Sequence, residues 1–375
     1  MQAEIVWKTA RMAKSDRNSK WKQNLRRRLL AWFRANARDL PWRSTRDPYH
    51  VWISEIMLQQ TQVVTVVPYF QRFIAEFPTI RSLATAHEDA VLRLWEGLGY
   101  YRRARQLHKA AQVIVHEHNG VFPHDPESVK ALPGIGRYTA GAILSIAFEA
   151  REPILEANTI RVLSRLIAYR DDTTSTEAQR VLWRAAEDFL PRKNVGDFNQ
   201  AMMELGSEVC TPREPRCEAC PVAMLCPTRA EGLQEVIPAP KKKTNYEDAF
   251  EACVVIWRNG KVLLRRCEEG ERWAGLWDFP RFEVDATRGA KLQRELGDGV
   301  RRLTGYDVGI GEHLTTIKHG VTRFRIMLTC YQADHLSGRK GRGEFAWVRP
   351  KQLDVYALSV TGRQVAKVVA GSLSK

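Results

Sequence analysis

Apolar residues recur with helical spacing through the first two thirds of the chain. Between residues 21 and 33, four of them fall on one face of a helix: Trp21, Leu25, Leu29 and Trp32. Prolines divide the region into many helices of modest length, and strand-like alternation is almost absent. The pattern predicts an all-α domain over residues 21–232, preceded by a basic flexible tail over residues 1–20.

The pattern changes after residue 232. Residues 233–246 contain two prolines and three consecutive lysines, which predicts an extended linker. Two β-rich runs then flank Asn259-Gly260, a strong hairpin signal, and further strand-like runs cover residues 311–318 and 322–332. A helical stretch lies near residues 290–303. Residues 247–375 are therefore predicted to form a smaller α/β domain, and the fold class is multidomain.

Composition narrows the function classes. No run of about 18 apolar residues occurs, and the N-terminus lacks the apolar core of a signal peptide. Seven cysteines, four of them clustered, favour a reducing compartment, so a cytoplasmic protein with no membrane span is expected. The net charge is +15, and residues 1–46 carry 13 Lys and Arg against three acidic residues. Such an excess indicates nucleic acid or anionic lipid as partner, with a solubilising surface as the alternative.

The four clustered cysteines have the spacing C-x6-C-x2-C-x5-C and are Cys210, Cys217, Cys220 and Cys226. Four thiolates within 17 residues suit one zinc ion or a [4Fe–4S] cluster. Zinc sites usually pair their cysteines as two CxxC units, and only Cys217 and Cys220 have that spacing here. The uneven spacing favours the iron–sulfur cluster, with zinc as the alternative.

The segment LPGIGRYTA (132–140) lies between two predicted helices. Gly134 and Gly136 allow backbone N–H groups to approach an anion, and the following helix N-terminus adds its positive dipole. This pattern is typical of a helix-hairpin-helix motif, which grips a DNA phosphate without reading sequence. A turn of this kind is also found as a simple helix connection.

Together these motifs resemble the helix-hairpin-helix DNA glycosylases that carry an iron–sulfur cluster, and among them the MutY-type adenine DNA glycosylases. The resemblance covers residues 21–232, and its most specific segments are LPWR (40–43), VWISEIMLQQTQV (51–63), GLGYYRRARQLHKAA (97–111), LPGIGRYTAGAI (132–143), FNQAMMELG (198–206) and the cysteine loop (210–226). GLWDFP (275–280) resembles the Nudix-like domain of such enzymes.

The resemblance implies a monomeric enzyme that binds double-stranded DNA, associates with the nucleoid and removes adenine mispaired with 8-oxoguanine or guanine. The base must be flipped out of the duplex before its N-glycosidic bond can be cut. The chemistry needs an acid that protonates the purine and a carboxylate that stabilises positive charge on the sugar. The implied cofactor is a structural [4Fe–4S] cluster.

Four residues match the family's catalytic positions. Glu55, in an apolar helix, corresponds to the general acid, and burial is expected to raise its pKa. Glu156 stands where the family has an aspartate, and Ala157 replaces a glycine. The longer side chain displaces the carboxylate, and an ångström-scale misplacement can cost on the order of a hundredfold in rate. Tyr138 and Asn158 are expected to organise the second carboxylate and the attacking water.

Tyr138 occupies the position where strand-cleaving relatives carry a Schiff-base lysine, so no lyase activity is expected. Further DNA contacts follow from the same segments. Gln60 and Thr61 resemble the pair that fills the gap in the base stack, and Tyr100 with Leu98 resembles the wedge beside the lesion. The remaining residues implied to line the adenine pocket are Trp42, Arg43 and Glu204.

The C-terminal domain departs from active Nudix hydrolases, which bind magnesium through several glutamates on one helix. Arginine and leucine replace the paired carboxylates at residues 301–303, so magnesium binding is not expected. The domain is interpreted as a module that inspects the base opposite adenine. In its recognition loop, His319 and Thr322 are the residues expected to contact the lesion.

Three alternatives remain. Glu156 could disable turnover and leave a lesion-binding protein. A thymine glycosylase acting on T·G mismatches shares much of the helical domain, although such enzymes generally lack the Nudix-like part. A free-nucleotide pyrophosphatase is the third, and the degraded carboxylate set argues against it.

Overall fold

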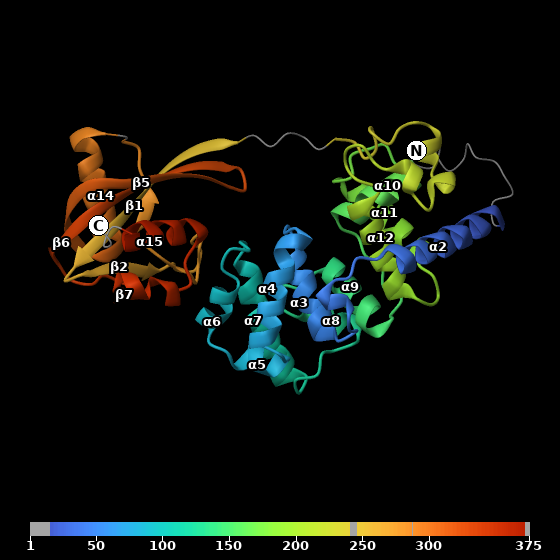
Figure 1. Cartoon of the computed structure of the whole chain (residues 1–375), viewed down its shortest axis with the longest axis horizontal. Helices are drawn as coiled ribbons and strands as arrows, with labels where there is room; N and C mark the ends of the chain where they lie inside the picture. Colours follow the sequence, from blue (N-terminus) through green and yellow to red (C-terminus); the bar gives the residue numbers. More distant parts are fainter. Residues whose placement is uncertain (1–15, 241–245, 287, 372–375) are drawn as a thin grey trace. The chain divides into compact units, whose positions relative to one another are not determined.

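The computed structural model describes residues 16–240, 246–286 and 288–371. These residues form two compact units, one made of residues 16–81 and 110–240 and the other of residues 82–109 and 246–371. Figure 1 traces the elements along the chain. The first unit is helical and the second is built on a β-sheet, as the change of hydrophobic pattern predicts. Among the described helices, none is long and apolar enough to cross a membrane.

The elements that lie wholly in the first unit are α2 (Asp16–Asn36), η1 (Pro41–Arg43), α3 (Pro48–Leu58), α4 (Val63–Glu76), α8 (Pro126–Ala131), α9 (Arg137–Phe148), α10 (Ala157–Leu166), α11 (Thr176–Phe189), α12 (Val195–Glu208), η2 (Cys217–Ala219), η3 (Ala223–Leu225) and α13 (Pro227–Ala230). Helices α5 (Ile80–Thr85) and α7 (Arg102–Glu117) each span a division between the units.

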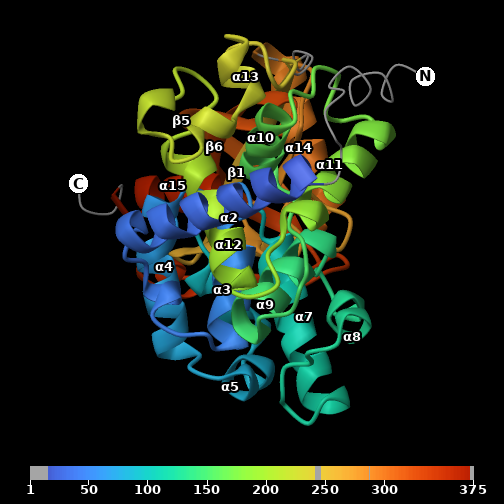
Figure 2. The ribbon, with the colours of Figure 1, turned by 90° about the vertical axis from the view of Figure 1, so that its right-hand side faces the viewer.

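Helix α2 crosses α12, and Figure 2 shows the crossing from the side of α2. Leu25 and Leu29 of α2 are fully buried in a core that includes Phe198 and Met202 of α12. The helix begins at Asp16, so residues 16–20 are helical and not part of the predicted flexible tail. Polar residues can extend a docked helix into solvent, which the sequence pattern does not reveal. Residues 1–15 of that predicted tail lie outside the described residues.

The predicted helix-hairpin-helix is formed by α8, a short turn and α9. Asp125 caps α8 by accepting a hydrogen bond from the Ser128 amide at 2.9 Å. Gly134 lies in the turn with φ +77°, a left-handed conformation that glycine adopts without strain. Gly136 is the N-cap of α9, so the glycine spacing sets where this helix begins.

The second unit contains α6 (Glu88–Leu94), β1 (Glu247–Arg258), β2 (Lys261–Arg266), β3 (Trp277–Asp278), β4 (Arg281–Glu283), α14 (Gly289–Thr304), β5 (Tyr306–Val321), β6 (Phe324–Gly338), β7 (Phe345–Val348), η4 (Pro350–Val355) and α15 (Val360–Gly371). The main strand order is β3-β2-β1-β6-β5, with β4 paired to β1 and β7 paired to β2. Strands β1 and β6 are parallel, and the other pairs are antiparallel.

Successive side chains of β1 are buried alternately in two hydrophobic cores, one on each face of the sheet. Cys253 and Val255 are buried with residues of α15, whereas Val254 and Ile256 are buried with residues of α14. The helices therefore cover opposite faces of the sheet (Figure 1). The predicted hairpin at Asn259-Gly260 is confirmed, and both residues have positive φ angles, +50° and +71°.

Residues 82–109 form part of the second unit, although the sequence places them inside the predicted helical domain. Ion pairs join this segment to the rest of the unit: Arg266 of β2 contacts Glu88 and Asp89 of α6, and Arg363 of α15 contacts Glu96. These partners are too far apart in sequence for any local pattern to reveal them. The predicted boundaries 21–232, 233–246 and 247–375 remain a prediction.

Candidate active site

The first unit contains a cavity of about 460 Å³, large enough for a small molecule or one extruded base. Five segments of the chain contribute side chains to its wall. Eight of the residues predicted from the sequence line it: Trp42, Arg43, Glu55, Thr61, Tyr138, Glu156, Asn158 and Glu204. The helical domain thus brings residues more than 150 positions apart to one site.

Glu55 lies in α3 among apolar residues and is only 6% exposed. Its pKa is raised from 4.5 to about 7. Burial is the main cause, and the charge of Glu156 acts in the same direction, whereas a hydrogen bond from Tyr138 and the charge of Arg43 oppose it. A carboxyl with this pKa is about half protonated at neutral pH. Glu55 is therefore able to donate a proton inside the cavity.

Tyr138 is in the first turn of α9, directly after the glycine turn. Its hydroxyl donates to Glu55 Oε2 at 2.6 Å and lies 3.4 Å from Met203 Sδ. Burial raises the pKa of Tyr138 well above 10, and the charges of Glu55 and Glu156 act in the same direction. The hydroxyl keeps its proton at neutral pH and fixes the orientation of the Glu55 carboxyl group.

Glu156 is the N-cap of α10. Its two carboxylate oxygens accept hydrogen bonds from the backbone amides of Asn158 at 2.8 Å and Thr159 at 2.9 Å, and the Thr159 hydroxyl accepts from the Glu156 amide at 2.7 Å. This is a capping box. Burial raises the pKa of Glu156, while the two amide hydrogen bonds and Arg161 lower it.

Ala157 is the first residue of α10, and it is not among the described residues with positive φ. Alanine therefore adopts the backbone conformation at this position without strain. The Glu156 side chain reaches the amides of Asn158 and Thr159 at the start of α10 and so caps the helix.

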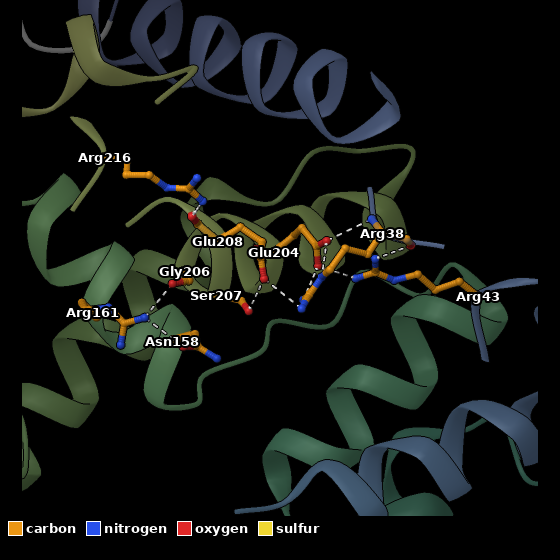
Figure 3. A network of polar contacts seen from close by, with 9 residues as sticks. All are labelled: Arg38, Arg43, Asn158, Arg161, Glu204, Gly206, Ser207, Glu208 and Arg216. Carbon is orange, nitrogen blue, oxygen red and sulfur yellow. Dashed lines mark hydrogen bonds and ion pairs between the residues drawn. The ribbon is translucent and has the colours of Figure 1, made fainter. Parts of the chain in front are cut away.

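Asn158 is held from the side of the cysteine loop. Arg161 Nη2 donates to Asn158 Oδ1 at 2.9 Å and to the Gly206 carbonyl at 2.8 Å, and its Nε donates to the Cys210 carbonyl at 2.7 Å. Figure 3 shows Arg161 with Asn158 and Gly206. A Cβ at Gly206 would lie 2.7 Å from the Asn158 Cβ, so only glycine allows α12 to approach α10 this closely.

Glu204 is 1% exposed, and its carboxylate accepts hydrogen bonds from two arginines (Figure 3). Arg38 donates to it from Nε and Nη2, both at 2.8 Å, and Arg43 Nη2 donates at 2.9 Å. Burial alone raises the pKa of Glu204, but the hydrogen bonds from Arg38 and Arg43 overcome this effect and hold it at about 2. Besides Glu156, the cavity therefore contains an ionised carboxylate, Glu204, and a protonatable carboxyl group, Glu55.

Arg38 also lines the cavity, and the sequence reasoning did not identify it. It stands two residues before the LPWR segment, within a basic N-terminal region where an arginine gives no signal of its own. Its Glu204 partner is 166 positions away.

Replacing Arg38 with methionine is expected to destabilise the protein by about 1–3 kcal/mol at neutral pH. The depressed pKa of Glu204 contributes stability above pH 4.5, and this contribution shrinks when its main hydrogen-bond donor is removed. Thermal unfolding at pH 7 measures the effect. Arg34→Met, at an exposed position of α2, is the matched control. Equal melting temperatures for both variants would contradict the prediction.

The other predicted DNA contacts lie elsewhere. Gln60, which follows α3, is exposed and has φ +56°. In the second unit, Leu98 is buried, whereas Tyr100 is 51% exposed with φ +49°. Thr322 is exposed at the turn between β5 and β6, with φ +51°. Their roles in DNA contact remain predictions.

His319 is half-buried near the end of β5, with its Nε2 3.1 Å from Arg281 Nη2. Burial lowers the pKa of His319, and the charge of Arg281 lowers it further, so the ring is neutral at pH 7. On α14, Glu295 Oε2 accepts hydrogen bonds from the amides of Asp285 and Ala286. The Glu295 carboxylate therefore binds the backbone of the segment that precedes α14.

The four cysteines of the loop 210–226 are partly buried. Three of them pack against the core of the first unit: Cys210, Cys220 and Cys226. Arg165 Nη1 lies 3.2 Å from Cys210 Sγ and 2.9 Å from the Thr211 carbonyl, so a cation faces the first thiol. Within the described residues, no three His, Cys, Asp or Glu side chains are grouped as ligands of a metal ion.

Comparison with known proteins gives two family matches. Residues 53–188 match the family described as HhH-GPD superfamily base excision DNA repair protein, and residues 252–367 match the NUDIX domain. The two matches lie within the two domains predicted from the sequence.

The chain is 40% identical over 256 residues to the adenine DNA glycosylase of Buchnera aphidicola subsp. Acyrthosiphon pisum, covering 68% of this chain and 73% of that protein. It is 41% identical over 265 residues to the adenine DNA glycosylase of Rattus norvegicus, covering 68% of this chain and 51% of the rat protein. The aligned region is thus about half of the rat relative. A solved thermostable thymine-DNA glycosylase matches 58% of this chain and 100% of its own, with 28% identity and a TM-score of 0.53.

Proposed function

The chain belongs to the adenine DNA glycosylase family, and we propose that it excises adenine mispaired with 8-oxoguanine or guanine in double-stranded DNA. The observation that carries the proposal is a cavity lined by a protonatable Glu55, a second carboxyl group, Glu156, and an ionised Glu204. An adenine flipped from the duplex would enter it, with Trp42 and Arg43 on its wall.

In the proposed reaction, Glu55 gives its proton to N7 of the adenine. The C1′–N9 bond then breaks, and its electron pair leaves with the base. The Glu156 carboxylate stabilises the positive charge at C1′, where a water molecule adds its oxygen. The proton released by that water restores Glu55. The products are free adenine and an abasic strand that remains intact.

Tyr138 supports a monofunctional reaction. A phenol whose pKa is raised well above 10 holds its proton and offers no amine for a Schiff base. Its hydrogen bond to Glu55 suits a positioning role for the acid. Asn158, fixed by Arg161, completes the wall beside Glu156.

We also propose that Cys210, Cys217, Cys220 and Cys226 hold a [4Fe–4S] cluster. The donor set fits this group chemically, because four thiols lie in one short loop, three of them pack against the core, and Arg165 faces one of them. When bound, the cluster would supply a structural cross-link of the loop and no catalytic step. Iron and acid-labile sulfide in equal amounts in the purified protein would support the cluster. One zinc ion per chain would instead show that the four cysteines form a zinc site.

The deciding experiment measures base release from duplexes that carry A opposite 8-oxoguanine, A opposite G, or T opposite G, under single-turnover conditions. Adenine release from the first two, without strand cleavage, is the expected result. Release of thymine alone would favour the second candidate, which the likeness to a thymine-DNA glycosylase supports. Tight binding without release of either base would instead identify a lesion-binding protein.

The Nudix-like part is proposed to inspect the base opposite adenine and not to hydrolyse nucleotides. Glu295 is already occupied by two backbone amides, and Lys291 lies 3.7 Å from its other oxygen. With magnesium and oxidised dGTP, the full chain is expected to release no pyrophosphate. Magnesium-dependent release would contradict this assignment.

A further inference from the structure

The turn between α6 and α7 has an unusual backbone. Gly97 and Gly99 have φ angles of +102° and +72°, and Tyr100 follows at +49°. A tyrosine in this region is strained, and such strain persists only where the surroundings hold the backbone. Tyr100 is nevertheless 51% exposed, so its own side chain contributes little packing. Other groups must therefore fix the turn.

Part of the support comes from the turn itself. Trp95 Nε1 donates to the Gly99 carbonyl at 3.2 Å. Arg103 Nη2 donates to the carbonyls of Leu98 at 3.3 Å and Gly99 at 3.1 Å. These bonds hold the carbonyl groups of the turn, and the amides of Glu96 and Leu98 donate to the carbonyls of Arg93 and Trp95, both at 3.1 Å. The Glu96 side chain and the Gly97 amide have further partners outside this set.

The rest comes from residues 353–363, more than 250 positions away in the same unit. Arg363 donates to both oxygens of Glu96, with Nη2 at 2.8 Å from Oε2. The Leu358 amide donates to Glu96 Oε2 at 3.4 Å. The Tyr101 hydroxyl accepts from the Gly97 amide at 3.3 Å and donates to the Leu358 carbonyl at 3.5 Å.

The orientation of the Arg363 side chain is also fixed by hydrogen bonds to backbone carbonyls. Its Nη1 donates to the Leu353 carbonyl and its Nη2 to the Tyr356 carbonyl, both at 2.7 Å. The side chains of Arg363 and Glu96 are 21% and 17% exposed, so solvent screens the pair only partly. The hydrogen bond to Glu96 raises the pKa of Arg363. A bidentate guanidinium held in this way imposes direction as well as charge.

We propose that Arg363 is a positioning residue, which holds the turn 95–101 through Glu96 and so presents Tyr100 for contact with DNA. The C-terminal segment would thereby act on the reaction through the turn that carries the predicted wedge. This inference rests on the proposed function only in the use of Tyr100. The claim that Arg363 orders the turn does not depend on that function, because it concerns the protein without DNA.

The first test is hydrogen exchange of the full chain without DNA, in Arg363→Met, Glu96→Gln and the double variant. Each single change is expected to speed exchange of the Gly97 and Leu358 amides about tenfold or more, while amides of α9 keep their rates. The double variant should match the faster single one, because both remove the same contact. Arg301→Met, which removes an exposed ion pair to Asp307, is the control.

The second test uses the same proteins with a duplex carrying A opposite 8-oxoguanine. Arg363→Met is expected to bind matched duplex like the natural protein and to release adenine about ten- to a hundredfold more slowly under single-turnover conditions. Arg363→Lys keeps the charge without the bidentate geometry and should lie between the two. A 2-aminopurine placed at the target position should show reduced extrusion in the same order.

Unchanged exchange in Arg363→Met would overturn the proposal, whatever the enzyme does. Faster exchange with natural rates of release and extrusion would equally overturn it, because the turn would then be ordered without consequence for the reaction. If the natural protein releases no adenine, the proposed function fails. Extrusion of 2-aminopurine then still decides whether Arg363 acts on DNA through the turn.

Discussion

Glu55→Gln is expected to reduce adenine release by about 10²- to 10⁴-fold, the usual contribution of a general acid. The amide has nearly the same shape and can still accept the hydrogen bond that Tyr138 donates to Glu55, but it has no acidic proton. Single-turnover release from the A opposite 8-oxoguanine duplex measures the loss. In the natural protein the rate should also fall as pH rises through about 7, where Glu55 loses its proton.

The same substitution is expected to stabilise the fold. Burial raises the pKa of Glu55 from 4.5 to about 7, so ionising it in the folded state is unfavourable. This cost is absent below pH 4.5, grows between pH 4.5 and 7, and is then constant at a value on the order of 3 kcal/mol. The melting temperature of Glu55→Gln should therefore exceed that of the natural protein by more at pH 8 than at pH 5.

Glu76→Gln, at an exposed position of α4, is the matched control and should change neither quantity. A Glu55→Gln protein that releases adenine at the natural rate would contradict the assignment of the acid. A stability gain that does not depend on pH would contradict the raised pKa while leaving the catalytic role open to the kinetic test.

Glu156→Gln is expected to abolish adenine release and also to cost about 1 kcal/mol of stability. The neutral amide cannot stabilise positive charge at C1′. It also offers one acceptor oxygen to two backbone amides, Asn158 and Thr159, that now bond the two oxygens of Glu156. Release rates under single turnover and thermal unfolding measure the two effects separately.

Glu156→Asp keeps the negative charge and shortens the side chain by one methylene, so it tests the effect of side-chain length alone. Aspartate is a preferred N-cap residue, so the start of α10 should persist and the carboxylate should stay charged. We expect this variant and the natural protein both to release adenine. A natural protein that binds the mispair without release, together with an active Glu156→Asp, would show that the longer side chain disables the site.

The sequence predicts the cavity well where short motifs carry the information. Glu55 and Tyr138 lie in two specific segments, and the structure joins them by a hydrogen bond of 2.6 Å. For Glu156 the sequence indicates a displaced carboxylate, but it does not reveal that the side chain caps a helix. That role depends on where α10 begins, and helix boundaries are the least reliable part of a pattern.

Long-range contacts could not be predicted. Arg38 reaches Glu204 across 166 positions, and Arg363 reaches Glu96 across 267. In a chain with 58 Lys and Arg, no single arginine stands out from a basic surface. Hydrophobic periodicity identifies the faces of helices and strands, but it does not say which charged residue meets which.

The assignment of residues 82–109 to the sheet-based unit bears on how the two parts of this chain could have come together. A domain added at one end of a gene can be lost again if its host is self-sufficient. Here Glu88, Asp89 and Glu96 of the helical segment have their arginine partners, Arg266 and Arg363, in the C-terminal part. Deleting the C-terminal part would remove the arginine partners of these acids, so the helical segment and the sheet are expected to be inherited together.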